Sequence, residues 1–287
     1  MGAFVGIIFD GLAYGSLLFL ISLGLSVTMG LMNFVNLAHG AFAMLGGFVC
    51  VELTRRLGMP FLFTLPVVFV AVGLVGAVLE RLLYRRLYAR SPLDQVLFTI
   101  GFAFMAGAAA TRVWGPSQQP VELPAFLRGQ VSVFGIDLGA YRLFLIALVV
   151  AVTAGLGLFL ARTRFGAQLR AAVDNPQAAA GVGINVGLLF SVTFALGSGL
   201  AGLGGALAID VLGLDPTFAL KYLVYFLVVV VVGGAGSIKG SLVAAVLLGV
   251  VDVAGKYYVP QIGSFIIYAA MVALLIAFPA GLYGRRS

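Results

Sequence analysis

Three polar side chains interrupt an apolar stretch near the start of the chain. Asn33, Asn36 and His39 follow one another at intervals of three, so on an α-helix they would cover one face about 120° wide. Amide and imidazole groups inside a lipid bilayer are costly unless they pair with other groups or meet water. These residues are therefore candidates for lining a translocation path or for fixing a broken helix beside it. Interhelical hydrogen bonding that only holds the bundle together is an equally good interpretation.

A second polar stretch, residues 162–186, combines arginines with helix-start signals. Residues after Gly166 form a short amphipathic helical pattern, and Asn175-Pro176 is a capping residue followed by a proline suited to the first turn of a second helix. A helix–turn–helix on the membrane surface would offer a rigid knob to a soluble partner. A solvated loop carrying arginines is the alternative. The candidate contact residues are Arg164, Gly166, Arg170, Asp174, Asn175 and Pro176.

A third stretch, residues 233–240, is rich in glycine but does not match a phosphate-binding loop. Gly233, Gly234, Gly236 and Gly240 lack the G-x-x-x-x-G-K-[ST] spacing, and Gly255-Lys256 is followed by Tyr257 instead of Ser or Thr. This chain is therefore not expected to hydrolyse ATP, and we interpret the glycine motif as structural. With one histidine and one cysteine, the chain offers no convincing catalytic set, so we expect no catalytic residue, metal or cofactor.

The composition defines the setting of these stretches. Of 287 residues, 62% are hydrophobic and only 9% are charged, whereas a soluble domain is about 25% charged. A soluble enzyme is excluded, because a globule of this size must present a largely polar exterior. The basic residues stand in short gaps between apolar runs instead of on one solvated face, so nucleic acid is not an expected partner. The expected partner is the lipid membrane.

Apolar runs long enough for membrane helices divide the whole chain. They cover residues 6–29, 37–54, 61–79, 94–113, 141–161, 187–209, 219–236, 239–256 and 262–281. A β-barrel would show alternating polar and apolar residues, but these runs are continuously apolar. We predict an all-α, polytopic membrane protein with about 8–10 membrane-spanning or re-entrant helices, forming a single transmembrane domain over residues 1–287.

The gaps between the runs carry an uneven charge. Ten basic and three acidic residues, a net charge of +7, lie in the gaps at 80–94 and 162–174, at Lys239 and at the C-terminus. The positive-inside rule makes that side cytoplasmic, the C-terminus included. The same alternation places the loop at residues 115–140 outside. It also places Arg55 and Arg56 outside, so either they are a tolerated exception or residues 31–50 are broken or re-entrant.

Together the three stretches resemble the permease subunits of bacterial branched-chain amino acid ABC importers, of the high-affinity leucine-isoleucine-valine type. Residues 30–47 look like that family's N-terminal signature, residues 166–185 like its cytoplasmic coupling segment, and residues 233–240 like its late glycine motif. Their order and spacing, and the length of the chain, agree over nearly the whole sequence. The resemblance implies a type II-like importer permease and assigns the residues of the second stretch to contact with an ATPase.

The resemblance also implies a set of partners. These are a second homologous permease, two cytoplasmic ATPase subunits, and a periplasmic or surface binding protein that delivers the amino acid. The chain would be a multi-pass protein of the bacterial inner membrane and not itself an enzyme. Related permeases for urea, short amides or sugars share the motifs. An ion-coupled secondary transporter is the alternative from a different class, although it would need an intramembrane ion site.

Overall fold

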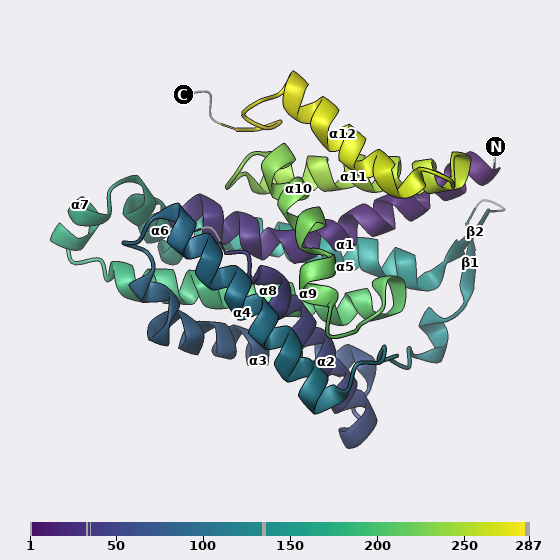
Figure 1. Ribbon diagram of the computed structural model, residues 1–287, viewed down its shortest axis with the longest axis horizontal. Coiled ribbons are helices and arrows are strands. Elements are labelled where there is room, and N and C mark those ends of the chain that lie inside the picture. Colours follow the sequence, from purple (N-terminus) through teal and green to yellow (C-terminus); the bar gives the residue numbers. More distant parts are fainter. Residues whose placement is uncertain (1, 33, 35, 134–135, 285–287) are drawn as a thin grey trace.

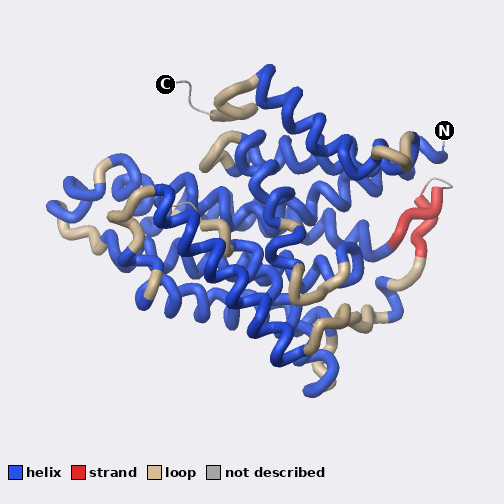
Figure 2. Tube along the Cα trace, viewed as in Figure 1, coloured by secondary structure: helices blue, strands red, loops and turns tan. Residues whose placement is uncertain are grey.

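Each apolar run of the sequence lies mostly in α-helix. The computed structural model describes residues 2–32, 34, 36–133 and 136–284, and helices account for most of them (Figure 1, Figure 2). The helices are α1 (Gly2–Met32), α2 (His39–Leu57), α3 (Phe61–Leu82), α4 (Pro92–Trp114), α5 (Ala140–Arg162), α6 (Arg164–Asp174), α7 (Pro176–Gly181), α8 (Val186–Leu212), α9 (Phe218–Lys221), α10 (Leu223–Gly233), α11 (Ile238–Tyr258) and α12 (Gly263–Ala277). Short 3-10 turns occur at Tyr84–Arg86 and Ala125–Leu127.

Within the described residues, six helices have the length and apolar character of a full membrane span. They are found in α1, α3, α4, α5, α8 and α11. Two further apolar helices, Phe218–Gly233 and Gly263–Ala277, are shorter. The predicted all-α, polytopic membrane fold is confirmed. α2 is also apolar over most of its 19 residues, but its last turn carries Arg55 and Arg56.

Two of the shorter helices start inside the bundle. The first residue of α2 is His39, and its Nε2 donates to the carbonyl oxygen of Ile21, 2.9 Å away, well inside α1. The chain therefore turns back along α1 before α2 begins. α9 begins at the same place, because a Cβ added to Gly40 would lie 2.5 Å from the Ala219 carbonyl oxygen. The starts of α2 and α9 thus meet between the long helices, a partial-span arrangement found in transporters.

The two halves of the chain contain the same order of helices, and the corresponding helices run in opposite directions. In each half a long helix (α1 or α8) is followed by a non-helical link, a shorter helix that starts inside the bundle (α2, or α9 with α10), and a second long helix (α3 or α11). α3 packs on α8 and α11 packs on α1, so the second long helix of each half lies against the first long helix of the other half. α1 and α8 themselves lie against each other (Figure 1).

Glycine allows α8 to approach α1 and α2 at backbone distance. A Cβ on Gly24 of α1 would overlap the Gly197 carbonyl of α8, and a Cβ on Gly205 of α8 would overlap the Ala43 carbonyl of α2. In lipid, where apolar side chains gain little by leaving the solvent, such close packing is a main source of helix association.

A small β-hairpin within residues 115–140 is an element that the sequence analysis did not expect. β1 (Gln130–Val133) pairs antiparallel with β2 (Ile136–Gly139), with Gln130 opposite Gly139. Figure 2 shows it in red at the right of the view, where α5 begins. It lies at the end of the bundle opposite α6 and α7 (Figure 1).

The end of the bundle that carries α6 and α7 also collects most of the arginines. Arg85 follows α3 and approaches Gly187 at the start of α8, and Gly30 near the end of α1 approaches Gly236 between α10 and α11. Segments far apart in the sequence therefore meet at one end. The basic residues at this end are Arg81, Arg85, Arg86, Arg90, Arg162, Arg164, Arg170 and Lys239.

The α2–α8 contact generates a stability prediction. We expect Gly205→Ala to lower the thermal midpoint of the detergent-purified protein, because the added methyl group must displace α2; overpacking of this kind costs about 1–3 kcal/mol. Gly157→Ala is the matched control, since a Cβ on Gly157 in α5 meets no atom within 4 Å. That control should be as stable as the wild type or slightly more so. Equal midpoints for the two variants would contradict the assigned packing.

Candidate functional site

The link between α1 and α2 holds the polar residues that the sequence analysis singled out. Asn36 and His39 are each 1% exposed, and Asn33 lies outside the described residues. The Asn36 side-chain oxygen accepts from the Ala38 backbone N–H at 3.1 Å, and the Leu37 backbone N–H donates to Thr99 Oγ1 of α4 at 3.2 Å. With the His39–Ile21 bond, these contacts attach the link to two helices.

One atom of this link stays without a partner. The buried Nδ2 of Asn36 has no hydrogen bond within the described part of the chain. Asn36 and His39 pack into the helix junction, and neither is among the residues that line the cavities described below. The structure therefore places them where they can hold a broken span together. Their role in translocation stays a prediction.

Residues 162–186 fold as the predicted helix–turn–helix. The Thr163 side chain accepts from the Gly166 backbone N–H at 3.2 Å and caps α6, while the Asn175 side chain accepts from Ala178 N–H at 2.9 Å and caps α7. Pro176 is the first residue of α7, where its missing N–H leaves no hydrogen bond unmade. Ala172, Ala179 and Leu189 form a small separate core beneath the two helices.

The start of this segment is attached rigidly to α5. Arg170 donates from Nη1 to the Leu160 carbonyl oxygen at 2.6 Å. A Cβ on Gly166 would overlap the same carbonyl group, so only glycine fits there. Arg164 and Asp174 are exposed, and at the tip Val182 is 78% exposed. The segment is thus a firmly held knob with an exposed, partly apolar tip.

The glycine motif forms the turn between α10 and α11. Gly234 and Gly236 have φ angles of 94° and 84°, a region that favours glycine. Gly240 lies so close to the Gly233 carbonyl that a Cβ would overlap it. The Tyr283 backbone N–H donates to the Gly233 carbonyl oxygen at 3.1 Å, which attaches the C-terminal segment to the motif.

Helix α6 and the glycine motif face each other across one cavity. It has a volume of about 750 Å³, and its lining includes Arg170 and Asp174 of α6, Gly236, and Tyr283. Gly30, from the sequence motif at the end of α1, lines it too. The structure therefore brings together parts of all three sequence motifs, which stand far apart in the chain.

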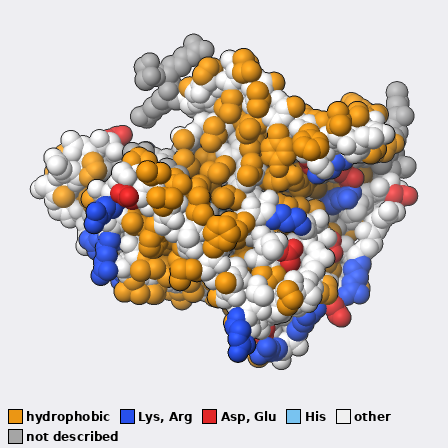
Figure 3. Space-filling model, in the orientation of Figure 1, with side chains coloured by type: hydrophobic (Ala, Val, Ile, Leu, Met, Phe, Trp, Pro, Cys, Tyr) orange, Lys and Arg blue, Asp and Glu red, His pale blue; other side chains and the backbone are white. Residues whose placement is uncertain are grey.

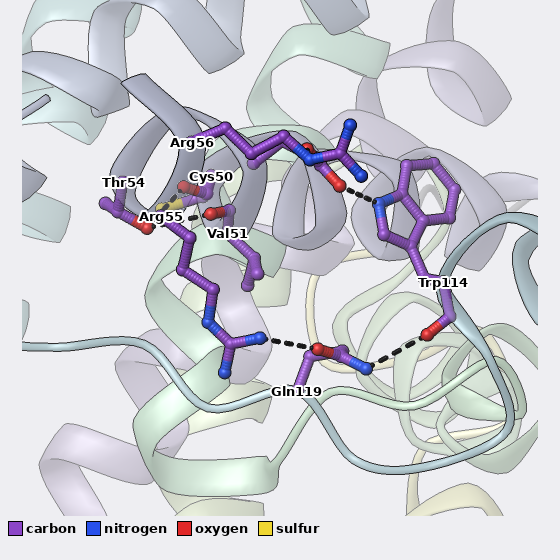
Figure 4. Close-up of polar contacts among 8 residues, drawn as sticks. Cys50, Val51, Thr54, Arg55, Arg56, Trp114 and Gln119 are labelled. Atoms are coloured by element: carbon purple, nitrogen blue, oxygen red, sulfur yellow. Dashed lines mark hydrogen bonds and ion pairs between the residues drawn. The ribbon is translucent and has the colours of Figure 1, made fainter. Parts of the chain in front are cut away.

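The two arginines that conflicted with the charge rule lie at the opposite end. Arg56 pairs with Glu52 at 2.6 Å, and Trp114 at the end of α4 donates to the same carboxylate at 2.8 Å. Arg55 donates to the Gln119 side chain at 2.8 Å, and Gln119 in turn donates to the Trp114 carbonyl oxygen (Figure 4). Because α2 starts inside the bundle, its end emerges at the end remote from α6 and α7. Arg55 and Arg56 thus lie opposite the arginine-rich end, where strict alternation placed them. Of the two explanations they are the tolerated exception, although non-helical residues do separate α1 from α2.

A charged cavity near the hairpin end was missed by the sequence analysis. Its volume is about 610 Å³. Its charged and aromatic lining residues are Asp10, Tyr14, Arg142, Lys221, Tyr222, Tyr225, Asp252, Lys256 and Tyr268. Figure 3 shows basic and acidic side chains towards the right of the face, and further basic side chains along its left and lower edges. The i, i+4 spacing of Asp252 and Lys256 within an apolar run is a signal that could have indicated this site.

Partial spans that meet inside a bundle of long apolar helices define the chain as a membrane permease. Comparison with known proteins identifies the kind. Residues 7–275 match the family model described as branched-chain amino acid transport system / permease component, so the chain belongs to that family.

Three relatives show the extent of the similarity. The high-affinity branched-chain amino acid transport system permease protein BraD of Pseudomonas aeruginosa is 26% identical, over 96% of this chain and 94% of its own. LivH of Escherichia coli strain K12, which carries the same description, is 25% identical with the same coverage. The probable branched-chain amino acid transport permease protein LivH of Methanocaldococcus jannaschii is 27% identical, over 92% of this chain and 85% of its own. No solved structure matches the chain.

The α1–α2 link generates a prediction about transport. We expect His39→Ala to lower amino acid uptake while the protein still inserts into the membrane, because the Ile21 carbonyl loses its donor. Such a loss costs about 1–3 kcal/mol, less than would unfold the bundle. Uptake by cells and the amount of protein in the membrane fraction are the two measurements. Normal uptake would mean that His39 serves only in packing.

Proposed function

We propose that this chain is one permease of an ABC importer for branched-chain amino acids, with the α6–α7 knob as its contact with an ATPase subunit. The knob is the observation that carries the proposal. The two helices are capped, have a core of their own and are attached rigidly to α5. A displacement of the tip would therefore move the whole knob instead of only deforming it. The knob also shares a cavity with the glycine motif, so its movement would reach α10 and α11.

The energy for transport would come from other subunits. The sequence lacks a phosphate-binding loop, so two cytoplasmic ATPases would bind and hydrolyse ATP. A periplasmic or surface binding protein would deliver the amino acid at the hairpin end, and a second, homologous permease would complete the path. The names of the relatives support the substrate class, since each is called a branched-chain amino acid permease.

The arginine-rich end would face the cytoplasm. This assignment follows from the positive-inside rule and places the C-terminal segment on the same side, because Tyr283 is bonded to the glycine motif there. The loop and hairpin at residues 115–140 would face outward. The protein would then be a multi-pass protein of the bacterial inner membrane.

The junction of α2 and α9 would be the point at which the path opens and closes. His39 fixes the start of α2 to α1, Asn36 accepts from the Ala38 backbone N–H just before α2, and Gly40 touches Ala219 in α9. A relative movement of the two partial spans at this contact would change access from one side to the other without disturbing the long helices. Asn33, Asn36 and His39 would thus act beside the path.

The exposed tip of the knob allows a direct test of the ATPase contact. We expect Val182→Asp to weaken co-purification of the ATPase subunits by about tenfold, because a charge buried without a partner costs more than 1.4 kcal/mol. Val131→Asp on the hairpin is the matched control, since Val131 is also exposed but lies at the other end. Unchanged association of the Val182 variant would contradict the coupling assignment.

The orientation is testable with single cysteines. The native Cys50 is buried, so background labelling by a membrane-impermeant thiol reagent should be low. In intact spheroplasts we expect Ser117→Cys to be labelled and Ala89→Cys to be protected until the membrane is permeabilised. Both residues are exposed in the structure, so only the side of the membrane on which each lies should decide whether the reagent reaches it. The reverse pattern would overturn the proposed orientation.

A further inference from the structure

The charged cavity at the hairpin end lies deep among the helices. Asp10 and Tyr14 come from α1, Lys221 ends α9, and Asp252 and Lys256 come from α11. The cavity therefore extends from the end of the bundle inward to α9, whose start touches α2 at Gly40. Its volume of about 610 Å³ is within the usual range of small-molecule sites, about 300–1,000 Å³.

The charges that line this cavity do not balance. Arg142 pairs with Asp10, and Lys256 Nζ lies 2.5 Å from Asp252 Oδ2. Lys221 is the remaining cation: it lies over the Tyr222 ring, 5.2 Å from its centroid, and no ion pair joins it to any described residue. An exposed ammonium group at the edge of a cavity, without an acidic partner there, is free to bind an anionic ligand group.

One acidic group in the cavity lacks a donor. Asp252 is 1% exposed, and its Oδ1 is buried without a hydrogen bond within the described part of the chain. A buried carboxylate oxygen in this state carries the full free-energy penalty of desolvation unless a donor arrives. An ammonium group with three N–H donors would supply it. The Tyr225 ring, which lines the same cavity, would add cation–π attraction, whereas the Tyr14 ring already faces Lys256 Nζ, 5.5 Å from its centroid.

We propose that this cavity is a transient binding site for the zwitterionic head of the transported amino acid. The substrate carboxylate binds Lys221, and its ammonium group binds Asp252. Apolar lining residues such as Ala13, Leu145 and Val253 receive the aliphatic side chain. Since the site opens at the proposed outer end, the inference rests on the proposed function and adds to it a place where the binding protein delivers the substrate.

The test is direct binding of L-leucine to the complete permease–ATPase complex prepared without the binding protein. Equilibrium dialysis with radiolabelled L-leucine should show saturable binding to the wild type. Two analogues each lack one charged group of L-leucine: 3-methylbutylamine lacks the carboxylate, and 4-methylpentanoate lacks the ammonium group. Each should compete about tenfold less well than L-leucine, the discrimination of one charge-assisted contact.

The variants assign each contact. Lys221→Gln should bind L-leucine and 3-methylbutylamine about equally, and Asp252→Asn should bind L-leucine and 4-methylpentanoate about equally. Lys221→Arg should restore most of the discrimination. Lys239→Gln, an exposed lysine at the opposite end, is the matched control and should behave as the wild type. The exposed Lys221 side chain can be replaced without loss of a buried contact, so that variant remains informative if the Asp252 variant misfolds.

Two results would overturn the inference: no saturable binding to the wild type, or equal discrimination between L-leucine and its analogues in the wild type and both variants. Neither result would affect the proposed function, which is judged separately by ATPase association through the α6–α7 knob. Conversely, loss of that association with intact leucine binding would leave the cavity assignment standing.

Discussion

Backbone-to-backbone contact around α8 is the constraint on which the rest of the structure depends. Gly197 meets Gly24 of α1, Gly202 meets Gly46 of α2, and Gly205 meets Ala43. In lipid there is little hydrophobic gain from bringing two apolar helices together, so such close contacts must supply much of the association energy. They also leave space for α2 and α9 to begin inside the bundle, with their polar ends shielded by protein instead of facing lipid.

This packing separates the polar chemistry into two ends. At one end the capped α6–α7 knob, the glycine motif and the arginines gather around a cavity that the C-terminal segment also lines. At the other end tyrosines and three basic side chains line a second cavity with two acidic ones. The junction of α2 and α9 lies between them. The two cavities thus lie at opposite ends, with the partial spans between them.

Much of this could be predicted from the sequence, because apolar runs and capping signals are local. The nine runs, the caps at Asn175-Pro176 and the family were predictable for that reason. The charged cavity was not, since Lys221 and Asp252 line it together only through the packing of α10 against α11. The hairpin also escaped prediction: its strands have four residues each, too short for a clear alternating pattern. The conflict at Arg55 and Arg56 was visible in the sequence, but the contact between Arg55 and Gln119 that holds this end of α2 is tertiary.

The central claim is that this chain conducts amino acids but draws its energy from partner subunits. The most direct measurement is uptake of radiolabelled L-leucine into proteoliposomes that contain this chain alone, or this chain with its partner permease and the ATPases. We expect no accumulation by the chain alone under a proton or sodium gradient, and ATP-dependent accumulation by the complete complex with the binding protein. Gradient-driven accumulation by the chain alone would contradict it.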